Sequence, residues 1–214
     1  MKNKYFLFLL VLVLSLFSFI KTDGKERPLL GKVIYLDPGH GGRDPGTNYQ
    51  NIKESDINLD ICLILREKLE LAGATVYMTR EGDYDLSSIS TNTKKRSDLT
   101  NRISAINSSN ADMYISIHLN ATTSSKWRGA QVFYDDINNQ NIKIADELTK
   151  SLETKREYQE IKNMYLNRSV KVPGVLIELG FLSNYYDREL LLKQEYQEEI
   201  ADKIVKGIVN YYQL

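Results

Sequence analysis

The chain contains two histidines, and both lie in segments that could hold a metal ion. His40 lies in a glycine-rich turn after one short apolar run, and His118 lies near the end of a second. Two carboxylates occupy comparable places: Glu54 opens a helical segment, and Glu178 ends the apolar run 175–178. Two histidines and one glutamate can hold a zinc ion and leave one position for water, while a second glutamate can act as a base. The four residues together predict a zinc hydrolase.

Each of these residues also has a purely structural interpretation. A histidine in a glycine turn is commonly structural, and a glutamate at a helix start commonly interacts with the helix dipole. For Glu54 alone, we place the structural interpretation first. Glu178 differs, because a carboxylate among apolar residues costs free energy to bury unless it is paired or bound to a metal. A shared metal site explains all four residues better than four coincidences do.

The apolar periodicity predicts strands that alternate with helices. The expected strands are 32–36, 75–79, 112–119, 130–134 and 175–178, with a short strand beginning at Tyr165. The expected helices are 55–72, a helix capped by Ser97 or Asp98 that runs to 107, then 142–152 and 196–211, while 81–95 is a polar, mobile loop. This order predicts a single α/β domain with a central, mostly parallel or mixed β-sheet flanked by α-helices. His40, His118 and Glu178 then fall at or just past strand ends, where such sheets bind ligands.

Composition narrows the class of protein. Lys+Arg and Asp+Glu number 28 each in 214 residues, so no basic face is expected and nucleic acid is excluded as the main partner. The single cysteine, Cys62, excludes an internal disulfide and lies in an apolar helical pattern typical of a core residue.

The first 31 residues are expected to direct export rather than to fold. Lys2 and Lys4 precede an apolar run from 5 to 20, which is typical of a signal peptide or an N-terminal membrane anchor, and a polar linker follows to 31. A helix of this run spans roughly 24 Å against about 30 Å for a bilayer core, which favours the signal peptide. No small-x-small cleavage site precedes Thr22, so an anchor that contacts the membrane stays open. The catalytic domain is expected over 32–214, outside the cytoplasm.

Four segments in order carry a resemblance to a known family. They are Asp37-Pro38-Gly39-His40-Gly41-Gly42, Lys53-Glu54-Ser55-Asp56-Ile57-Asn58-Leu59, Ser116-Ile117-His118-Leu119-Asn120-Ala121 and Val175-Leu176-Ile177-Glu178-Leu179-Gly180-Phe181-Leu182-Ser183-Asn184. The chain thereby resembles the zinc-dependent N-acetylmuramoyl-L-alanine amidases. The resemblance implies Zn²⁺ held by His40, Glu54 and His118, with Glu178 as the catalytic carboxylate. It also implies peptidoglycan as substrate, cut at the amide between the lactyl group of muramic acid and L-alanine.

Within that family the chain most resembles the sporulation amidases, which help to make muramic δ-lactam in the spore cortex for germination. This implies action in the cell wall or the forespore intermembrane space. Two alternatives stay open: a zinc peptidase that cuts within the stem peptide, and a non-catalytic wall-binding module. Product analysis of muropeptides separates the first, and the intact Glu178 argues against the second.

Several residues near the motifs have two interpretations. Asn120 and Asn184 are interpreted as substrate contacts or as loop caps, and Arg102 as a structural ion-pair partner rather than a substrate clamp. Trp127, the only tryptophan, could stack on glycan, although ordinary packing is the commoner outcome.

Control of the site is also predicted from the glycine-rich loop. A loop with four glycines between 39 and 46 has a high ordering cost, so the isolated domain is expected to bind zinc poorly. An activating protein partner or the wall substrate would then order the loop and tighten zinc by linkage. A preformed site that needs no partner is the alternative.

Overall fold

The computed structural model describes residues 26–90 and 92–213, so the predicted export segment lies outside the described residues. Within them no helix is both long and apolar enough to span a membrane. The elements are β1 (Val33–Pro38), β2 (Asn48–Tyr49), β3 (Ile52–Lys53), α2 (Glu54–Leu71), β4 (Thr75–Met78), α3 (Lys94–Asn107), β5 (Met113–Asn120), β6 (Gln131–Tyr134), α4 (Asn141–Ser151), β7 (Gln159–Glu160), β8 (Gly174–Phe181), α5 (Tyr185–Leu191) and α6 (Gln194–Gln213).

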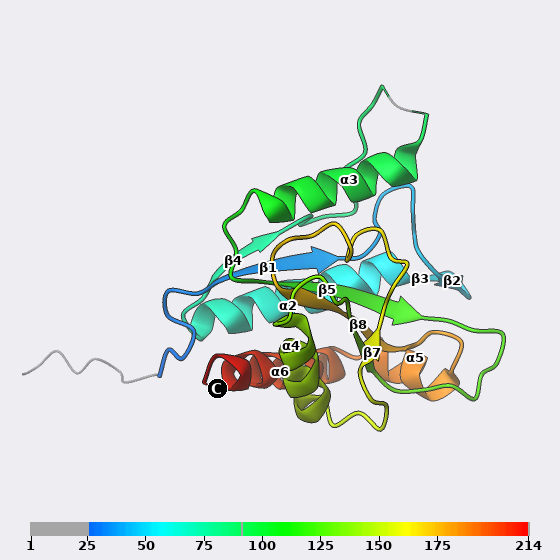
Figure 1. The fold of residues 1–214 in the computed structure, drawn as a ribbon. Helices are drawn as coiled ribbons and strands as arrows, with labels where there is room; N and C mark the ends of the chain where they lie inside the picture. Colours follow the sequence, from blue (N-terminus) through cyan, green and yellow to red (C-terminus); the bar gives the residue numbers. More distant parts are fainter. Residues whose placement is uncertain (1–25, 91, 214) are drawn as a thin grey trace, which may run out of the picture.

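The main sheet has six strands in the order β4-β1-β5-β8-β6-β7 (Figure 1). The strands β4, β1, β5 and β8 run parallel to one another, whereas β6 runs antiparallel to β8. The predicted α/β domain with a mixed sheet is therefore confirmed. Since successive side chains of a strand alternate between faces, every second residue of β5 and β8 belongs to the same layer.

The two faces of the sheet are covered unequally. Helices α2, α4 and α6 lie together on one face, and α3 lies on the other (Figure 1). The larger core fills the first face and includes Ile61, Leu65, Ile115 and Ile204, each fully buried. On the α3 face, Leu166 and Val170 of the segment between β7 and β8 complete a smaller cluster with residues of β1, α3 and β5. The irregular segment between β7 and β8 thus helps to cover the face of the sheet on which α3 lies.

The observed elements differ from the expected ones at identifiable places. Tyr165 does not begin a strand; it lies in the loop before β8, and the short strand β7 comes earlier. The predicted cap by Ser97 or Asp98 is wrong, because α3 begins at Lys94 and the Asp98 carboxylate instead accepts from Leu86 N–H and Arg102. The helix α5 was not expected, and its seven residues are too few for a clear apolar period. Leu29, within the expected linker, is fully buried in the core and donates its N–H to Ala72.

Gly174 permits the close pairing of β8 with β5 and gives a direct test of the fold. A Cβ at this position would overlap the carbonyl oxygen and ring of Tyr114 on β5. We expect Gly174→Ala to lower the free energy of unfolding by about 1–3 kcal/mol, the usual cost of overpacking. Gly82→Ala is the matched control, because its Cβ would meet only the Tyr84 ring at 3.3 Å. Urea unfolding of both variants measures the change in the free energy of unfolding. Equal unfolding midpoints for the two variants would contradict the close approach of Gly174 to Tyr114.

Candidate metal centre and active site

His40 lies in a turn that needs a left-handed backbone conformation at His40 itself and a residue without a side chain at position 39. Its φ is +62°, in the left-handed region, and the preceding Gly39 lies so close to His118 that a Cβ would overlap the imidazole ring. The Gly39 N–H donates to the carbonyl of Ile117 at 2.9 Å, which extends the β1–β5 ladder into the turn. The sheet itself therefore brings the two histidines together.

Two buried guanidinium groups hold the carbonyl groups of this turn. Arg80 donates to the carbonyl oxygens of Pro38, Gly39 and Ser55 at 2.7–3.0 Å. Arg102 donates to those of Pro38 and His40. Both arginines are 1% exposed. Because these donors are arranged in planar forks, the carbonyl groups of the glycine-rich turn are held by side chains from other elements.

Asp37 neutralises Arg102 beneath the turn. Its carboxylate accepts from Arg102 at 2.8 Å and from the hydroxyl groups of Thr79 and Ser116, each at 2.7 Å. Burial alone would raise its pKa, but Arg102 and the two hydroxyl groups outweigh burial and hold the pKa of Asp37 below its ordinary value. The carboxylate is therefore charged at neutral pH, and the pair links β1, α3, β4 and β5.

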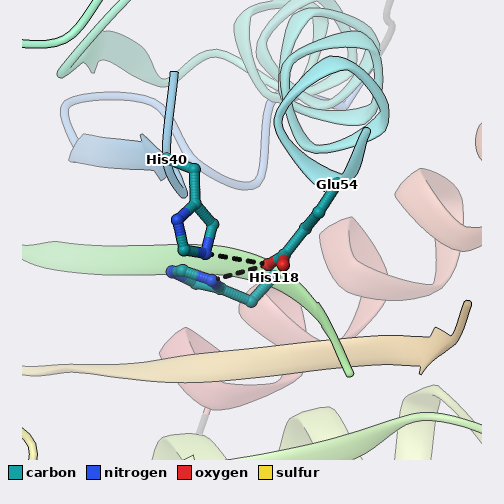
Figure 2. Close-up of side chains that lie close together, drawn as sticks. All are labelled: His40, Glu54 and His118. Atoms are coloured by element: carbon teal, nitrogen blue, oxygen red, sulfur yellow. Dashed lines mark hydrogen bonds and ion pairs between the residues drawn. The ribbon is translucent and has the colours of Figure 1, made fainter. Parts of the chain in front are cut away.

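Glu54 is the first residue of α2, as predicted, and its carboxylate lies beside the two imidazole rings, facing one nitrogen of each (Figure 2). Its Oε1 lies 2.9 Å from Nδ1 of His118 and 3.2 Å from Nε2 of His40. Backbone N–H groups of Leu119 and Thr47 also donate to this carboxylate, at 3.1 and 2.9 Å. The nearby histidines hold the pKa of Glu54 well below its ordinary value although burial opposes them.

This trio suits a zinc ion. One ligand atom of each residue lies within 4.8 Å of the others, and imidazole nitrogen with carboxylate oxygen is a zinc donor set. The far ring nitrogen of His40, Nδ1, lies 3.1 Å from Asp44, the kind of outer contact that orients a metal-bound imidazole. Gly46 packs directly against two of these residues, because a Cβ at this position would come within 2.6 Å of Glu54 and of His40. The residues present therefore fit the expected metal.

Glu178 lies on the same face as His118, because the two are paired in register across β8 and β5. The predicted position at a strand end is wrong: β8 continues to Phe181. Its Oε2 is buried and has no hydrogen-bond partner among residues 26–90 and 92–213, and burial raises the pKa of Glu178 to about 7. With both histidines and Glu54 it lines a cavity of about 350 Å³. A carboxyl group that titrates near neutral pH is suited to accept and return a proton.

The other predicted residues have definite places. Asn184 caps α5 by accepting from the N–H groups of Tyr186 and Asp187, so the capping interpretation is confirmed. Arg102 is confirmed as a structural ion-pair partner, and Asn120 lines the cavity. Trp127 is not packed in the core but is 55% exposed. Thr79-Arg80 also matches the pattern of the resemblance, but the residue type of Arg80 indicates no chemical role, because its partners are backbone carbonyls of distant residues.

Comparison with known proteins identifies the family. A family model described as N-acetylmuramoyl-L-alanine amidase matches residues 34–210. The chain belongs to this amidase family. The match includes all four residues of the site, and the resemblance drawn from the four segments is confirmed.

Three known amidases are similar to this chain over most of its length. It is 44% identical, over 96% of its length and 91% of the relative's, to a germination-specific N-acetylmuramoyl-L-alanine amidase of Bacillus subtilis. It also matches the structure of the CwlD amidase from Clostridioides difficile in complex with the GerS lipoprotein. That match has a TM-score of 0.81 and 40% identity, and it covers 85% of this chain and 98% of the other. The catalytic domain of CwlV, an amidase from Bacillus (Paenibacillus) polymyxa, matches with a TM-score of 0.74 and 26% identity over 85% of this chain and 98% of that chain.

The buried pair under the turn predicts a pH-dependent stability. A folded pKa below the unfolded value of about 3.9 stabilises the amidase above that pH, and the stabilisation is lost as the pH falls through the folded pKa. We expect Asp37→Asn to lower the free energy of unfolding by about 3–5 kcal/mol at pH 7, because Arg102 loses one of its two carboxylate partners. The difference from wild type should narrow below pH ~4.

Denaturant unfolding at several pH values measures this difference. Asp202→Asn is the control, because it breaks the exposed Lys68–Asp202 pair and should cost less than about 1 kcal/mol. A loss for Asp37→Asn that stays constant down to pH ~3 would show that its carboxylate is not the stabilising group.

Proposed function

We propose that this amidase cleaves peptidoglycan at the amide between the lactyl group of N-acetylmuramic acid and L-alanine, with His40, Glu54 and His118 as zinc ligands and Glu178 as the catalytic carboxylate. One observation carries the assignment of roles. Three donors converge within 4.8 Å, and a fourth carboxylate with a raised pKa lines the same cavity without touching them. The family supports the choice of bond, and this geometry supports the division of the four residues into ligands and base.

The chain's own residues supply positioning and proton transfer. Zinc bound to the trio would lower the pKa of a water molecule and polarise the lactyl carbonyl group. Glu178 takes the proton from the attacking water and returns it to the departing amino group of L-alanine. The contact of Asp44 with Nδ1 leaves Nε2 of His40 directed at the site, and the N–H groups of Leu119 and Thr47 fix Glu54. The geometry before reaction therefore depends on these contacts.

The relatives support a cellular setting for the reaction. We propose that the amidase acts outside the cytoplasm, in the cell wall or the forespore intermembrane space, and contributes to muramic δ-lactam formation for germination. The germination-specific relative at 44% identity supports this. In this proposal, residues 1–31 are a signal peptide or membrane anchor plus linker, and 32–214 form the catalytic domain.

A protein partner is part of the proposal. The CwlD structure contains a lipoprotein, which supports a similar partner here. The turn that carries His40 is already held by Arg80 and Arg102, so a partner would act on zinc affinity by contacts other than ordering that turn. Zinc affinity and muropeptide cleavage, measured for the purified domain with and without extract of sporulating cells, test this. If the isolated domain already binds zinc tightly, and extract changes neither value, no activating partner exists.

Ligands and base are separated by two kinds of substitution. Replacing His40 or His118 by Ala should remove zinc, because two donors hold it far less tightly than three. Glu178→Gln should keep zinc and lower turnover by about two to four orders of magnitude, the usual contribution of general acid–base catalysis. Elemental analysis, circular dichroism and mass spectrometry of digested muropeptides measure metal, fold and products.

Glu160→Gln is the control, since this residue lines the neighbouring cavity with Glu178 but lies outside the ligand trio. It should retain zinc and most activity. Loss of zinc in Glu178→Gln would make that residue a ligand, and shortened stem peptides instead of free lactyl ends would make the enzyme a peptidase.

The pH profile gives an independent test of Glu178. A base acts only when deprotonated, so activity falls as the pH drops through its pKa. Burial raises this pKa from 4.5 to about 7, and a bound dication would lower it again. We expect the acid limb of kcat/KM between these two values and expect Glu178→Gln to abolish it. An acid limb that persists in that variant would assign it to another group.

A further inference from the structure

Arg156, in the segment between α4 and β7, has surroundings that the proposed reaction does not explain. Its guanidinium carbon lies 4.9 Å from the centre of the Trp127 ring and 4.8 Å from that of Phe181. Its Nη1 donates to the side-chain oxygen of Gln131 at 3.0 Å. A guanidinium has five N–H donors, so contacts with two rings and one amide fix the cation while leaving most donors unused.

The sheet places this cation beside the active site. Gln131 on β6 is the register partner of Glu178 on β8. The side chains of such partners start about 5 Å apart. Arg156 is therefore connected to the proposed base, Glu178, through the neighbouring side chain of Gln131, to which it is hydrogen-bonded. A bulge in β8 also brings Phe181, one of the two rings that contact Arg156, to this face of the sheet. His118 pairs with Glu178 and Asn120 with Phe181, so the extra residue returns Phe181 to the face that carries Glu178.

Three other cations near the site have carboxylate partners. Lys95 lies 3.6 Å from Asp44, and Lys162 lies 3.6 Å from Glu160. Arg128 lies 3.9 Å from Asp187. Arg156, which is half-buried, has no carboxylate of residues 26–90 or 92–213 within ion-pair distance. A positioned, partly desolvated guanidinium without an anion is a binding site for one.

We infer that Arg156 binds the free α-carboxylate of the second stem-peptide residue, a glutamate joined through its side chain, and so sets substrate preference at this position. The inference rests on the proposed function. That carboxylate lies about two residues from the scissile amide, roughly 7 Å along an extended chain. On the protein side, Glu178 and Gln131 are register partners, and Arg156 lies one 3.0 Å hydrogen bond beyond Gln131. The planar fork of arginine matches the two oxygens of a carboxylate, whereas an amidated residue offers no charge.

The test compares two muropeptides that differ only at this group, one with the free carboxylate and one with the carboxamide. Wild type should show about a tenfold lower KM for the free acid, the size of effect expected for one charge-assisted hydrogen bond, with similar kcat. Arg156→Gln should raise KM for the acid to the value for the amide, and it should change KM for the amide much less. Arg156→Lys should restore part of the preference, because it keeps the charge but not the fork.

Arg168→Gln is the matched control, since that arginine already pairs with the Asp136 carboxylate and should keep the wild-type preference. Equal KM values for acid and amide in wild type would overturn the inference, and so would an Arg156→Gln defect of the same size on both substrates. Release of free lactyl ends from the amidated muropeptide reports the proposed function separately, whatever the preference.

Binding without turnover gives a second readout at the same place. Trp127 is the only tryptophan of the chain and contacts Arg156, so its fluorescence reports this subsite directly. In Glu178→Gln protein, titration with the acid muropeptide should change Trp127 emission at about tenfold lower concentration than the amide does. In the double variant Glu178→Gln/Arg156→Gln, the acid and the amide should change Trp127 emission at the same concentration. If the acid still acts at lower concentration, the substrate carboxylate binds at another place.

Discussion

The buried ion pair between Arg102 and Asp37 is the interaction on which the rest of the site depends. Both residues are 1% exposed, and burying two charges has a large desolvation cost that only full hydrogen bonding offsets. Here the Asp37 carboxylate accepts from Arg102, Thr79 and Ser116, and Arg102 uses its remaining donors on Asp98 and on the carbonyls of Pro38 and His40. The pair thereby connects the end of β1 to its neighbouring strands and to α3.

Arg102 of this pair, together with Arg80, accounts for the conformation of the glycine-rich turn. Residues in the left-handed region, such as His40, persist only where the surroundings over-determine them. Arg80 and Arg102 provide this by holding the carbonyls of three consecutive residues, Pro38 to His40. The ordering cost that the glycines create is met by guanidinium groups from other elements rather than within the loop. This favours the preformed site among the two alternatives that the sequence left open.

The sequence revealed those parts of the site whose residue types are unusual in their context. Two histidines beside apolar runs and a glutamate inside one are visible because burying or clustering them needs a reason. The alternation of strands and helices likewise gave the α/β class and the approximate elements. Features that depend on pairing between distant strands were not visible. The extent of β8 past Glu178 and the bulge that turns Phe181 to the same face arise from strand register, which a single sequence does not encode locally. The contact of Arg156 with Trp127 joins two connecting segments far apart in the sequence, which no local pattern predicts.

Protons and a metal ion compete for the side chains of His40, Glu54 and His118. Without a metal, Glu54 raises the pKa of His40 against the effect of burial, and the same charge adds to the burial that raises the pKa of Glu178. A metal ion needs the neutral form of each imidazole and the charged form of Glu54, so binding must displace any proton held there. Affinity for the metal therefore falls as the pH falls. The base, by contrast, is held on a neighbouring strand by the sheet, so its position does not depend on whether the trio holds a proton or a metal.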